Sequence, residues 1–392
     1  MRGSMDGKTP IQKILVIKLR HIGDVLLSSA LFHNLKEAFP RAQVCALVNS
    51  GTEEMLTGNP FVDRVFVYDR GIKQEPLFRR LSGEFSFYRM LRRERFDAVL
   101  NLTEGDRGAL VALLSGAQVR AGLDPQQGGM LGKRWFYTHI LPRNPEGNLH
   151  ALEKNLLFLE PLGAATTSKR ARFPFAPEDR DHVTELLAAE PGGYFHAHVT
   201  SRWIFKALPH RKAAFLIDQL AERSGLLPVL TCAAEQRELD YLAALLPLLR
   251  TRYRDLSGVL TLKQVGALSA GARFFVGVDS APMHMAAALD IPVLGLFGPS
   301  TAQEWGPWDN ALEANGYLSQ NGLQHSGRHT VLQAGGKCVP CCRDGCNGSK
   351  VSDCLDFPEE QLCLVSADFL QRLDAGTLKS GSRSVCQGGQ VG

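Results

Sequence analysis

Buried-strand patterns alternate with amphipathic segments in the first half of the chain. A helix is expected from about Val25 to Phe39, because its helical pattern stops at Pro40. Continuous apolar runs, which are typical of parallel strands covered on both faces, lie at 13–18, 43–48, 65–68 and 98–102. Strands that alternate with helices in this way predict a parallel, doubly wound α/β sheet.

The same alternation begins again in the second half. Strand patterns lie at 194–199, 228–231, 274–278 and 292–297, and helical patterns lie at 211–224, 235–247, 261–270 and 280–289. Because 392 residues exceed one ordinary hydrophobic core, we expect two domains. The predicted organisation is two Rossmann-like domains at 12–175 and 176–358, a closing helix at 359–375, and a disordered tail at 376–392 rich in Gly, Ser and Gln.

Composition adds two exclusions to this picture. With 44% hydrophobic and 21% charged residues, the chain has the balance of a globular protein. It has no run of about 18 apolar residues that would predict a membrane-spanning helix. No apolar export signal precedes Ile11, so we expect a cytoplasmic protein.

Positive charge is concentrated in the first half. The net charge of +4 combines an excess of eight positive charges over residues 1–175 with an excess of four negative charges over the rest. The densest group of arginines is Arg79, Arg80, Arg89, Arg92, Arg93 and Arg95. This distribution favours an anionic acceptor or peripheral contact with an anionic membrane, although a solvated helix face explains the arginine group equally well. Nucleic acid is not expected as a partner, because no recognised binding motif accompanies the charge.

The turn that follows the strand at 274–278 is the clearest candidate ligand site. Asp279 or Ser280 can cap the next helix, and Pro282 suits its first turn. The free N–H groups and the dipole of such a helix start favour a phosphate, and His284 lies about one turn further along. Open α/β sheets bind ligands at this end of their strands. A purely structural crossover with Asp279 as a cap explains the same pattern equally well.

Three other strand ends carry polar residues. Asp24 follows the first strand, where a carboxylate can take the proton of an attacking sugar hydroxyl or can simply cap a helix. Thr200, Ser201 and Lys206 follow the first strand of the second half. Hydroxyls there can hold phosphate oxygens, and Lys206 can neutralise a departing diphosphate, although most lysines are surface residues. Glu235 follows the next strand and can bind ribose hydroxyls or cap a helix.

Cysteines are unevenly distributed. Nine cysteines, an odd number, in a chain expected to be cytoplasmic argue against structural disulfides. Five of them lie close together near the C-terminus, at Cys338, Cys341, Cys342, Cys346 and Cys354. A Cys-x2-Cys pair with further cysteines is typical of a structural zinc site, so Zn²⁺ is one interpretation and ordinary reduced thiols are the other.

Four separated motifs together resemble the bacterial ADP-heptose:lipopolysaccharide heptosyltransferases. They lie at 18–27, which contains Gly23-Asp24, at 200–206, at 231–235, and at 278–284 followed by 296–300. The pattern Ser201-Arg202-Trp203-x-x-Lys206 is most similar to heptosyltransferase III, and the resemblance covers residues 12–310. One departure is Ala233, which stands where the family has a glycine before the acid. The resemblance implies the GT-B fold, two Rossmann-like domains with a central cleft.

The resemblance also implies an activity, namely inverting transfer of heptose from ADP-L-glycero-β-D-manno-heptose to an inner-core heptose of lipopolysaccharide on lipid A. No cofactor or catalytic metal is implied. Asp24 is the implied general base, and Lys206 is implied to stabilise the leaving ADP. The implied donor-binding residues are Thr200, Ser201, Lys206, Glu235, Leu260, Asp279, Ser280, Ala281 and His284. The implied acceptor-binding residues are Lys18, Arg20, His21 and Gly23.

Three alternatives stay open at this point. The chain can be a family member with another acceptor, such as a heptosyltransferase I or II, because the acceptor domain carries the weakest motifs. It can be a nucleotide-sugar epimerase of the same fold. It can also be a non-catalytic nucleotide-sugar-binding protein, although the presence of both Asp24 and Lys206 favours an enzyme.

Overall fold

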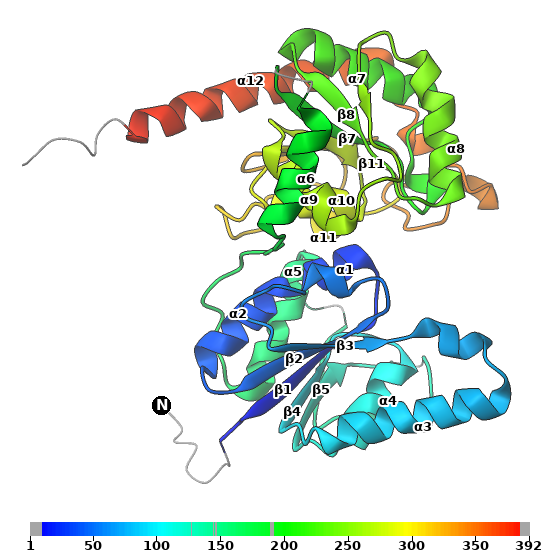
Figure 1. Ribbon diagram of the computed structural model, residues 1–392, viewed down its shortest axis with the longest axis vertical. Helices are drawn as coiled ribbons and strands as arrows, with labels where there is room; N and C mark the ends of the chain where they lie inside the picture. The colour runs from blue at the N-terminus through cyan, green and yellow to red at the C-terminus, as the bar shows by residue number, and fades with distance from the viewer. Residues whose placement is uncertain (1–9, 127, 144, 146, 189–191, 385–392) are drawn as a thin grey trace, which may run out of the picture. The chain divides into compact units, whose positions relative to one another are not determined.

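The computed structural model describes residues 10–384, apart from 127, 144, 146 and 189–191 (Figure 1). The chain divides between Pro174 and Phe175 into two compact units, called unit 1 and unit 2 below. This boundary lies one residue from the predicted one. Within the described residues, no helix is both long enough and apolar enough to cross a membrane.

Unit 1 is built on a sheet of six parallel strands in the order β3-β2-β1-β4-β5-β6. The strands are β1 (Lys13–Lys18), β2 (Gln43–Asn49), β3 (Arg64–Tyr68), β4 (Ala98–Asn101), β5 (Val119–Leu123) and β6 (His139–Leu141). The α-helices are α1 (Ile22–Leu26), α2 (Ser29–Ala38), α3 (Leu77–Arg93), α4 (Asp106–Ser115) and α5 (Ala151–Leu156). Short 3₁₀ turns are η1 (Glu53–Met55), η2 (Arg70–Gln74), η3 (Lys133–Phe136) and η4 (Leu157–Leu162).

Helices cover both faces of this sheet, with α2 and α5 on one side and α3 and α4 on the other (Figure 1). That double cover explains why the central strands are apolar at nearly every position, since both faces of the sheet are buried. On the side of α3 and α4 the core includes Leu15 and Ile17 of β1, Leu47 of β2 and Leu91 of α3. The predicted parallel, doubly wound sheet is therefore confirmed in this unit.

One predicted helix is wrong in detail. The sequence favoured a single helix from Val25 to Phe39, but the structure has two helices that meet at Ser28. The Ser28 hydroxyl donates to the carbonyl oxygen of Val25 at 2.6 Å, and its N–H bonds to the same carbonyl. Such a local hydrogen bond from serine competes with the helical pattern, which explains the break.

Unit 2 has a seven-stranded sheet in the order β12-β13-β11-β10-β7-β8-β9, parallel except for the edge strand β12. The strands are β7 (Tyr194–His198), β8 (Leu227–Leu230), β9 (Arg254–Asp255), β10 (Phe275–Val278), β11 (Val293–Phe297), β12 (Gly322–Ser326) and β13 (His329–Gln333). The α-helices are α6 (Pro177–Leu187), α7 (His210–Ser224), α8 (Gln236–Leu245), α9 (Leu262–Gly271), α10 (Ala281–Ala288), α11 (Ala302–Trp305) and α12 (Glu359–Ser384). The 3₁₀ turns are η5 (Ile204–Lys206), η6 (Leu246–Leu248), η7 (Cys346–Gly348) and η8 (Asp353–Leu355).

Unit 2 repeats the strand arrangement of unit 1, with β13 in the place of β6, and adds the antiparallel strand β12 at that edge. Helices α7, α8 and α12 cover one face of its sheet, and α6, α9 and α10 cover the other (Figure 1). The order reverses between β1 and β4 in unit 1 and between β7 and β10 in unit 2. In open α/β sheets the carboxyl ends of the strands at such a switch point form the ligand site.

Gly277 allows the two central strands of unit 2 to come close together. It pairs with His198 across β10 and β7. A Cβ atom at this position would lie 2.4 Å from the carbonyl oxygen of His198, which no side chain tolerates. The glycine therefore sets how closely the loops that leave β7 and β10 approach each other.

The C-terminal helix is longer than predicted. The sequence predicted a helix at 359–375 and disorder from 376, whereas α12 continues to Ser384. Glycines at 376 and 381 weaken a helix, but no proline follows Pro358 to stop one that has already formed. The helix packs on α7 and contributes Leu362, Val365 and Phe369 to the core. The rest of the predicted tail, 385–392, lies outside the described residues.

Candidate functional site

The central feature of unit 2 is an ion pair at its switch point. Lys206 follows β7 in the turn η5, and Asp279 follows β10 directly. The Lys206 Nζ atom donates to Asp279 Oδ2 at 2.6 Å. The predicted site residues from two motifs far apart in the sequence are thus brought together at the carboxyl edge of the sheet.

Asp279 stays ionised although it is buried. Burial alone would raise its pKa, but the charges of Lys206 and His284, together with hydrogen bonds from Lys206 and Ser300, outweigh burial and hold the pKa below its usual range. The His284 Nε2 atom lies 3.9 Å from Asp279 Oδ1. Asp279 is therefore a fixed negative charge that orients a lysine and a histidine.

Two buried hydroxyl groups flank this ion pair. Thr200 lies two residues beyond β7, and Ser280 stands at the N-cap of α10 without capping it. Within the described residues, neither Thr200 Oγ1 nor Ser280 Oγ has a hydrogen-bond partner. Buried polar groups are nearly always paired, so two unpaired ones, one of them at the start of a helix, fit a site built for an anionic ligand. The neighbouring Ser201 Oγ accepts the Trp203 N–H at 3.3 Å.

The other predicted donor residues occupy the same edge of unit 2. Ala281 is the first residue of α10. Glu235 stands at the N-cap of α8, where its exposed carboxylate lies 3.9 Å from Arg202 Nε. Leu260 is half-buried and packs on the cluster that includes Leu256. These residues follow the carboxyl ends of β8, β9 and β10, as ligand-binding residues of such sheets do.

A chain of buried polar side chains beside this edge was not predicted from the sequence. The His196 Nε2 and His198 Nδ1 atoms lie 2.7 and 3.0 Å from Thr231 Oγ1, and His198 Nε2 lies 4.0 Å from a carboxylate oxygen of Glu238. Burial lowers the pKa of His198 to about 4 and raises the pKa of the Glu238 carboxyl. The available signal was the spacing of the two histidines, because residues i and i+2 of a strand share a face.

In unit 1 the predicted residues follow β1. Asp24 lies inside the first turn of α1, and His21 occupies the N-cap position, so Asp24 is not the cap. The Arg20 Nε atom lies 3.7 Å from Asp24 Oδ1. Lys18 ends β1 and donates to Asn155 Oδ1 of α5 at 3.1 Å, which turns its ammonium toward that helix. Gly23 lies within α1 beside the carboxylate.

A cavity of about 670 Å³ lies at the same edge of unit 1. It spans the switch point, where the Leu19 N–H donates to Thr103 Oγ1 at 3.0 Å and ties the ends of β1 and β4 together. Charged side chains line the cavity, namely Arg70, Arg80, Glu84, Asp106 and Arg107. Of these residues only Arg80 was noted from the sequence, because they come from η2, α3 and the first turn of α4 and share no local motif.

Glu84 and Arg107 form the fixed part of the cavity wall. The Arg107 Nη2 atom donates to Glu84 Oε1 at 2.8 Å, and the Tyr68 hydroxyl donates to the same oxygen at 2.7 Å. Burial would raise the pKa of Glu84, but these two hydrogen bonds outweigh burial and lower it. Arg70 and Arg80 add exposed positive charge, so the cavity suits a polar, anionic ligand.

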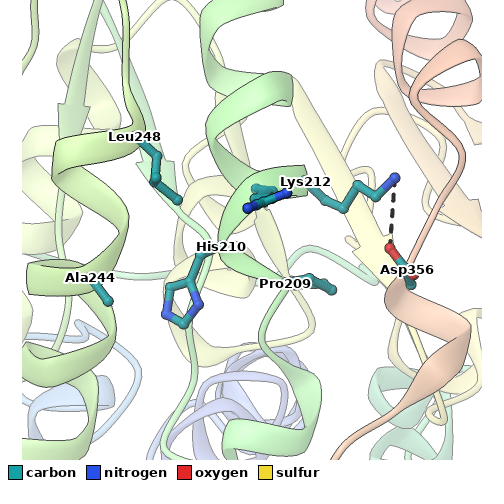
Figure 2. A pocket seen from close by; sticks show the side chains of 7 residues that line it. Pro209, His210, Lys212, Ala244, Leu248 and Asp356 are labelled. Atoms are coloured by element: carbon teal, nitrogen blue, oxygen red, sulfur yellow. Dashed lines mark ion pairs between the residues drawn. The ribbon is translucent and has the colours of Figure 1, made fainter.

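A second hollow of about 380 Å³ lies beside the start of α7 in unit 2 (Figure 2). His210, Lys212 and Leu248 are among the residues that line it, and Lys212 Nζ lies 3.7 Å from Asp356 Oδ1 across its rim. None of the residues predicted for the donor or acceptor lines this hollow. It is therefore separate from the candidate site.

The clustered cysteines do not form an assembled metal site in the described part of the chain. Across the described residues, no group of three or more His, Cys, Asp or Glu side chains is arranged to hold a metal ion. All five clustered cysteines are described, and they lie in the segment between β13 and α12, with Cys346 in η7 and Cys354 in η8. Cys338 and Cys342 are exposed, whereas a closed zinc site needs four converging ligands. The segment instead touches the donor edge, where the Cys342 N–H donates to the carbonyl oxygen of Pro299 at 2.8 Å.

Two doubly wound units with the same strand order define the GT-B class of glycosyltransferases. The chain belongs to glycosyltransferase family 9 (heptosyltransferase), whose model matches residues 84–333, more than half of the chain. The family resemblance carried by the four motifs is confirmed, and the protein is a glycosyltransferase.

Relatives and solved structures agree with this assignment. The chain is 30% identical over 299 residues to lipopolysaccharide heptosyltransferase 3 of Escherichia coli. The aligned residues cover 75% of this chain and 86% of that protein. Its fold is similar to the crystal structure of a family 9 glycosyl transferase from Veillonella parvula, with a TM-score of 0.73 and 19% identity over 93% of this chain and 98% of the other. It is also similar to E. coli ADP-heptose lps heptosyltransferase II, with a TM-score of 0.69 and 19% identity over 93% of this chain and all of the other.

Proposed function

We propose that this protein is an inverting heptosyltransferase of the heptosyltransferase III type. It transfers heptose from ADP-L-glycero-β-D-manno-heptose to an inner-core heptose of lipopolysaccharide. The observation that carries the donor half is the 2.6 Å Lys206–Asp279 ion pair beside the unpaired hydroxyls of Thr200 and Ser280. The acceptor half is supported by the 30% identity to a lipopolysaccharide heptosyltransferase 3.

In this proposal the loops at the end of β7 and β10 hold the donor diphosphate. The hydroxyls of Thr200, Ser201 and Ser280 donate to phosphate oxygens, and the free N–H groups at Ala281 and the start of α10 add the helix dipole. A lysine ammonium has three N–H donors, so Lys206 can keep its bond to Asp279 and still donate to phosphate. Positive charge at this point stabilises ADP as it leaves.

The remaining donor groups are assigned to particular parts of the nucleotide sugar. Glu235 accepts hydrogen bonds from the ribose hydroxyls, and Leu260 packs on the adenine. Asp279 and His284 orient the heptose and the diphosphate. Sugar hydroxyls and a ribose need acceptors, and the carboxylates of Glu235 and Asp279 supply them at the carboxyl edge of the sheet.

On the acceptor side, Asp24 takes the proton from the attacking hydroxyl of the core heptose. The acceptor oxygen then forms a bond to the anomeric carbon while the bond from that carbon to the diphosphate oxygen breaks. ADP leaves with the electron pair, and the configuration at the anomeric carbon inverts. Lys18, Arg20, His21 and Gly23 position the acceptor, and the cavity lined by Arg70 and Arg107 receives its anionic groups.

The proposed acceptor is anchored in a membrane by lipid A, so the protein acts at the cytoplasmic face of the inner membrane as a peripheral protein. The excess of positive charge over residues 1–175 supports this location, because it favours contact with an anionic lipid surface.

The test is release of ADP from ADP-heptose with lipopolysaccharide acceptors truncated at successive core heptoses. We expect release only with the acceptor that presents the inner-core heptose modified by heptosyltransferase III. Release with an earlier acceptor would assign a type I or type II activity instead. Binding of ADP-heptose without release on any acceptor would identify a non-catalytic nucleotide-sugar-binding protein and overturn the proposal.

A further inference from the structure

Helix α3 of unit 1 exposes large apolar side chains on its outer side. Phe78 is 84% exposed, Phe85 is 68% exposed, and Leu81 lies between them in the sequence. Residues spaced by three and four positions share one face of a helix, so these three form a stripe. Exposed apolar side chains that are scattered singly need no explanation, but an aromatic stripe on one helix does.

The same helix is strongly basic. Its seventeen residues contain five arginines and a single acid, Glu84. That acid faces inward, where it bonds to Arg107 and Tyr68, so the outer side of the helix presents no carboxylate. At 100° per residue, Arg89 and Arg93 continue the face that begins with Phe78, and both are exposed.

A second group of exposed apolar side chains borders the 670 Å³ cavity of unit 1. Leu131 is 99% exposed and Trp135 is 83% exposed, on and just before the turn η3. This segment is tied to the cavity wall, because Asp106 accepts the Met130 N–H at 3.0 Å and lies 3.2 Å from Lys133 Nζ. Asp106 lines the cavity, as do Arg80 and Leu81 of α3. Both exposed apolar groups therefore stand at the rim of the 670 Å³ cavity.

We propose that the outer face of α3, with the tip formed by Leu131 and Trp135, docks onto the surface of an anionic lipid bilayer. Phe78, Phe85 and Trp135 enter the boundary between headgroups and acyl chains, and Arg89 and Arg93 pair with lipid phosphates. Helices with an apolar stripe and a basic polar face bind bilayers in this way, and tryptophan favours the same depth.

This inference rests on the proposed function in one respect, because it explains how a lipid-anchored acceptor reaches the cavity. The rim of the cavity lies against the membrane, and the sugar chain of the acceptor enters from there. Charge complementarity decides between a bilayer and a second copy of this chain. Two copies of α3 would bring ten arginines together with no acid on the outer side of the helix, and Glu75, just before the helix and 3.8 Å from Arg79, offsets one charge in each copy. Anionic headgroups neutralise the remaining arginines directly.

The test is flotation of the full-length protein with vesicles of phosphatidylglycerol and phosphatidylcholine, without donor or acceptor. We expect binding to vesicles that contain phosphatidylglycerol, weakened by added salt, and little binding to pure phosphatidylcholine. The double variant Phe78→Ser/Phe85→Ser should bind at least about tenfold more weakly, since each aromatic side chain contributes buried apolar area. The charge variant Arg89→Glu/Arg93→Glu should lose the preference for phosphatidylglycerol.

The matched control is Leu318→Ser, which removes an apolar side chain that is 79% exposed in unit 2. It should bind vesicles as the unchanged protein does. Equal vesicle binding by the Phe78→Ser/Phe85→Ser variant would overturn the proposal, as would the absence of any binding to phosphatidylglycerol at low salt. Self-association that the same variant abolishes, without vesicle binding, would assign the face to a second copy and also overturn it.

The docking face and the proposed function can fail separately. Phe78 and Phe85 do not line the cavity, so the double variant should release ADP at the unchanged rate with a deacylated, water-soluble acceptor. With acceptor embedded in phosphatidylglycerol vesicles its rate should fall about tenfold or more, in parallel with binding. An unchanged rate on embedded acceptor would contradict the proposed docking face and leave the proposed transferase activity unaffected.

Discussion

Lys206 and Asp279 are separated by 73 positions in the sequence, yet their side chains meet at 2.6 Å at the switch point of unit 2. The meeting depends on the close approach of β7 and β10 at Gly277. Because Asp279 is buried and ionised, it fixes the lysine in one orientation before any ligand arrives. Preorganised positive charge of this kind stabilises a leaving diphosphate without a cost of reorientation.

Replacing the lysine should affect stability and activity together. In Lys206→Met, the buried carboxylate of Asp279 loses its main counter-charge, so its pKa rises and the free energy of unfolding at neutral pH should fall by about 2 kcal/mol. The rate of heptose transfer should fall by about 10²- to 10³-fold, the usual cost of losing one electrostatic stabiliser. Chemical denaturation and ADP release measure the two effects.

The double variant Lys206→Met/Asp279→Asn separates them. It removes both charges, so much of the lost stability should return while the activity stays low. Recovery of activity in the double variant would show that Lys206 acts only by pairing Asp279, which contradicts its assignment to the leaving diphosphate.

Asp24→Asn should stop turnover without unfolding the protein. The substitution keeps the shape of the side chain but removes the base, so kcat should fall by about 10²- to 10⁴-fold. The partner Arg20 is about half exposed, and an ion pair of this kind adds less than about 1 kcal/mol to stability. Single-turnover kinetics and the melting temperature measure the outcome.

The matched control breaks the same ion pair from the other side. Arg20→Gln keeps the Asp24 carboxylate, so we expect it to weaken acceptor binding while kcat at saturating acceptor stays within about tenfold of the unchanged protein. Near-normal turnover of Asp24→Asn would contradict the assignment of Asp24 as the general base.

The strand frame of both units could be predicted from the sequence because the central strands are buried on both faces. The apolar runs at 13–18 and 43–48 are stable only where both faces of a strand are buried, which is the middle of a sheet covered by helices on both sides. The site residues Asp279 and Lys206 could be named for a related reason. Residues that bind ligands at a switch point directly follow the strands, so they belong to local motifs that can be recognised in the sequence.

The acceptor cavity could not be predicted in the same way. Arg70 comes from η2 and Arg107 from the start of α4, and only the packing of α3 on α4 brings them to one wall. No periodicity links these positions along the chain.

The helix break at Ser28 was missed because it depends on a local hydrogen bond from the Ser28 hydroxyl to the Val25 carbonyl oxygen, which the apolar periodicity does not indicate. A zinc site at the cysteines could be suggested from their spacing but not established, because spacing alone does not show that thiolates converge.

Arg70→Ala should weaken acceptor binding alone. Arg70 is exposed at the cavity of unit 1, so its loss should raise KM for the lipopolysaccharide acceptor by about tenfold, leaving KM for ADP-heptose and kcat unchanged. Arg211→Ala is the matched control, because Arg211 lines the other hollow, at the start of α7. An equal effect of both substitutions on acceptor KM would mean that net charge, not the cavity, sets affinity.

Removal of metal should leave the fold unchanged. Because the clustered cysteines are not arranged as a metal site among the described residues, chelator should not lower the melting temperature, and purified protein should hold no stoichiometric zinc. Cys341→Ser should cost less than about 1 kcal/mol of stability, whereas Cys45→Ser, in the core of unit 1, should cost about 1 to 3 kcal/mol because its hydroxyl is buried. One zinc ion per chain, lost together with thermal stability, would contradict this.

Buried neutral histidines should make the protein less stable as the solution becomes mildly acidic. Burial lowers the pKa of His198 to about 4 and that of His329 to about 4 as well. An unfolded chain protonates its histidines near pH 6.5, so between about pH 6.5 and pH 4 the unfolded state binds protons that the folded state does not. Stability is therefore complete above that window and falls as the pH decreases through it, by at most about 1.4 kcal/mol per pH unit for each histidine.

The neighbouring carboxyl of Glu238 has the opposite effect on the pH dependence of stability. Burial raises the pKa of Glu238, so this carboxyl takes up a proton earlier in the folded state and offsets part of the loss above about pH 4.5. Burial also lowers the pKa of His196, so three buried histidines outweigh one carboxyl and the net slope stays positive. His198→Asn keeps a polar group beside Thr231 but cannot titrate, so its stability should depend less steeply on pH between about pH 7 and pH 5. Urea unfolding at several pH values measures both slopes, and identical slopes for the two proteins would show that His198 is not buried in its neutral form.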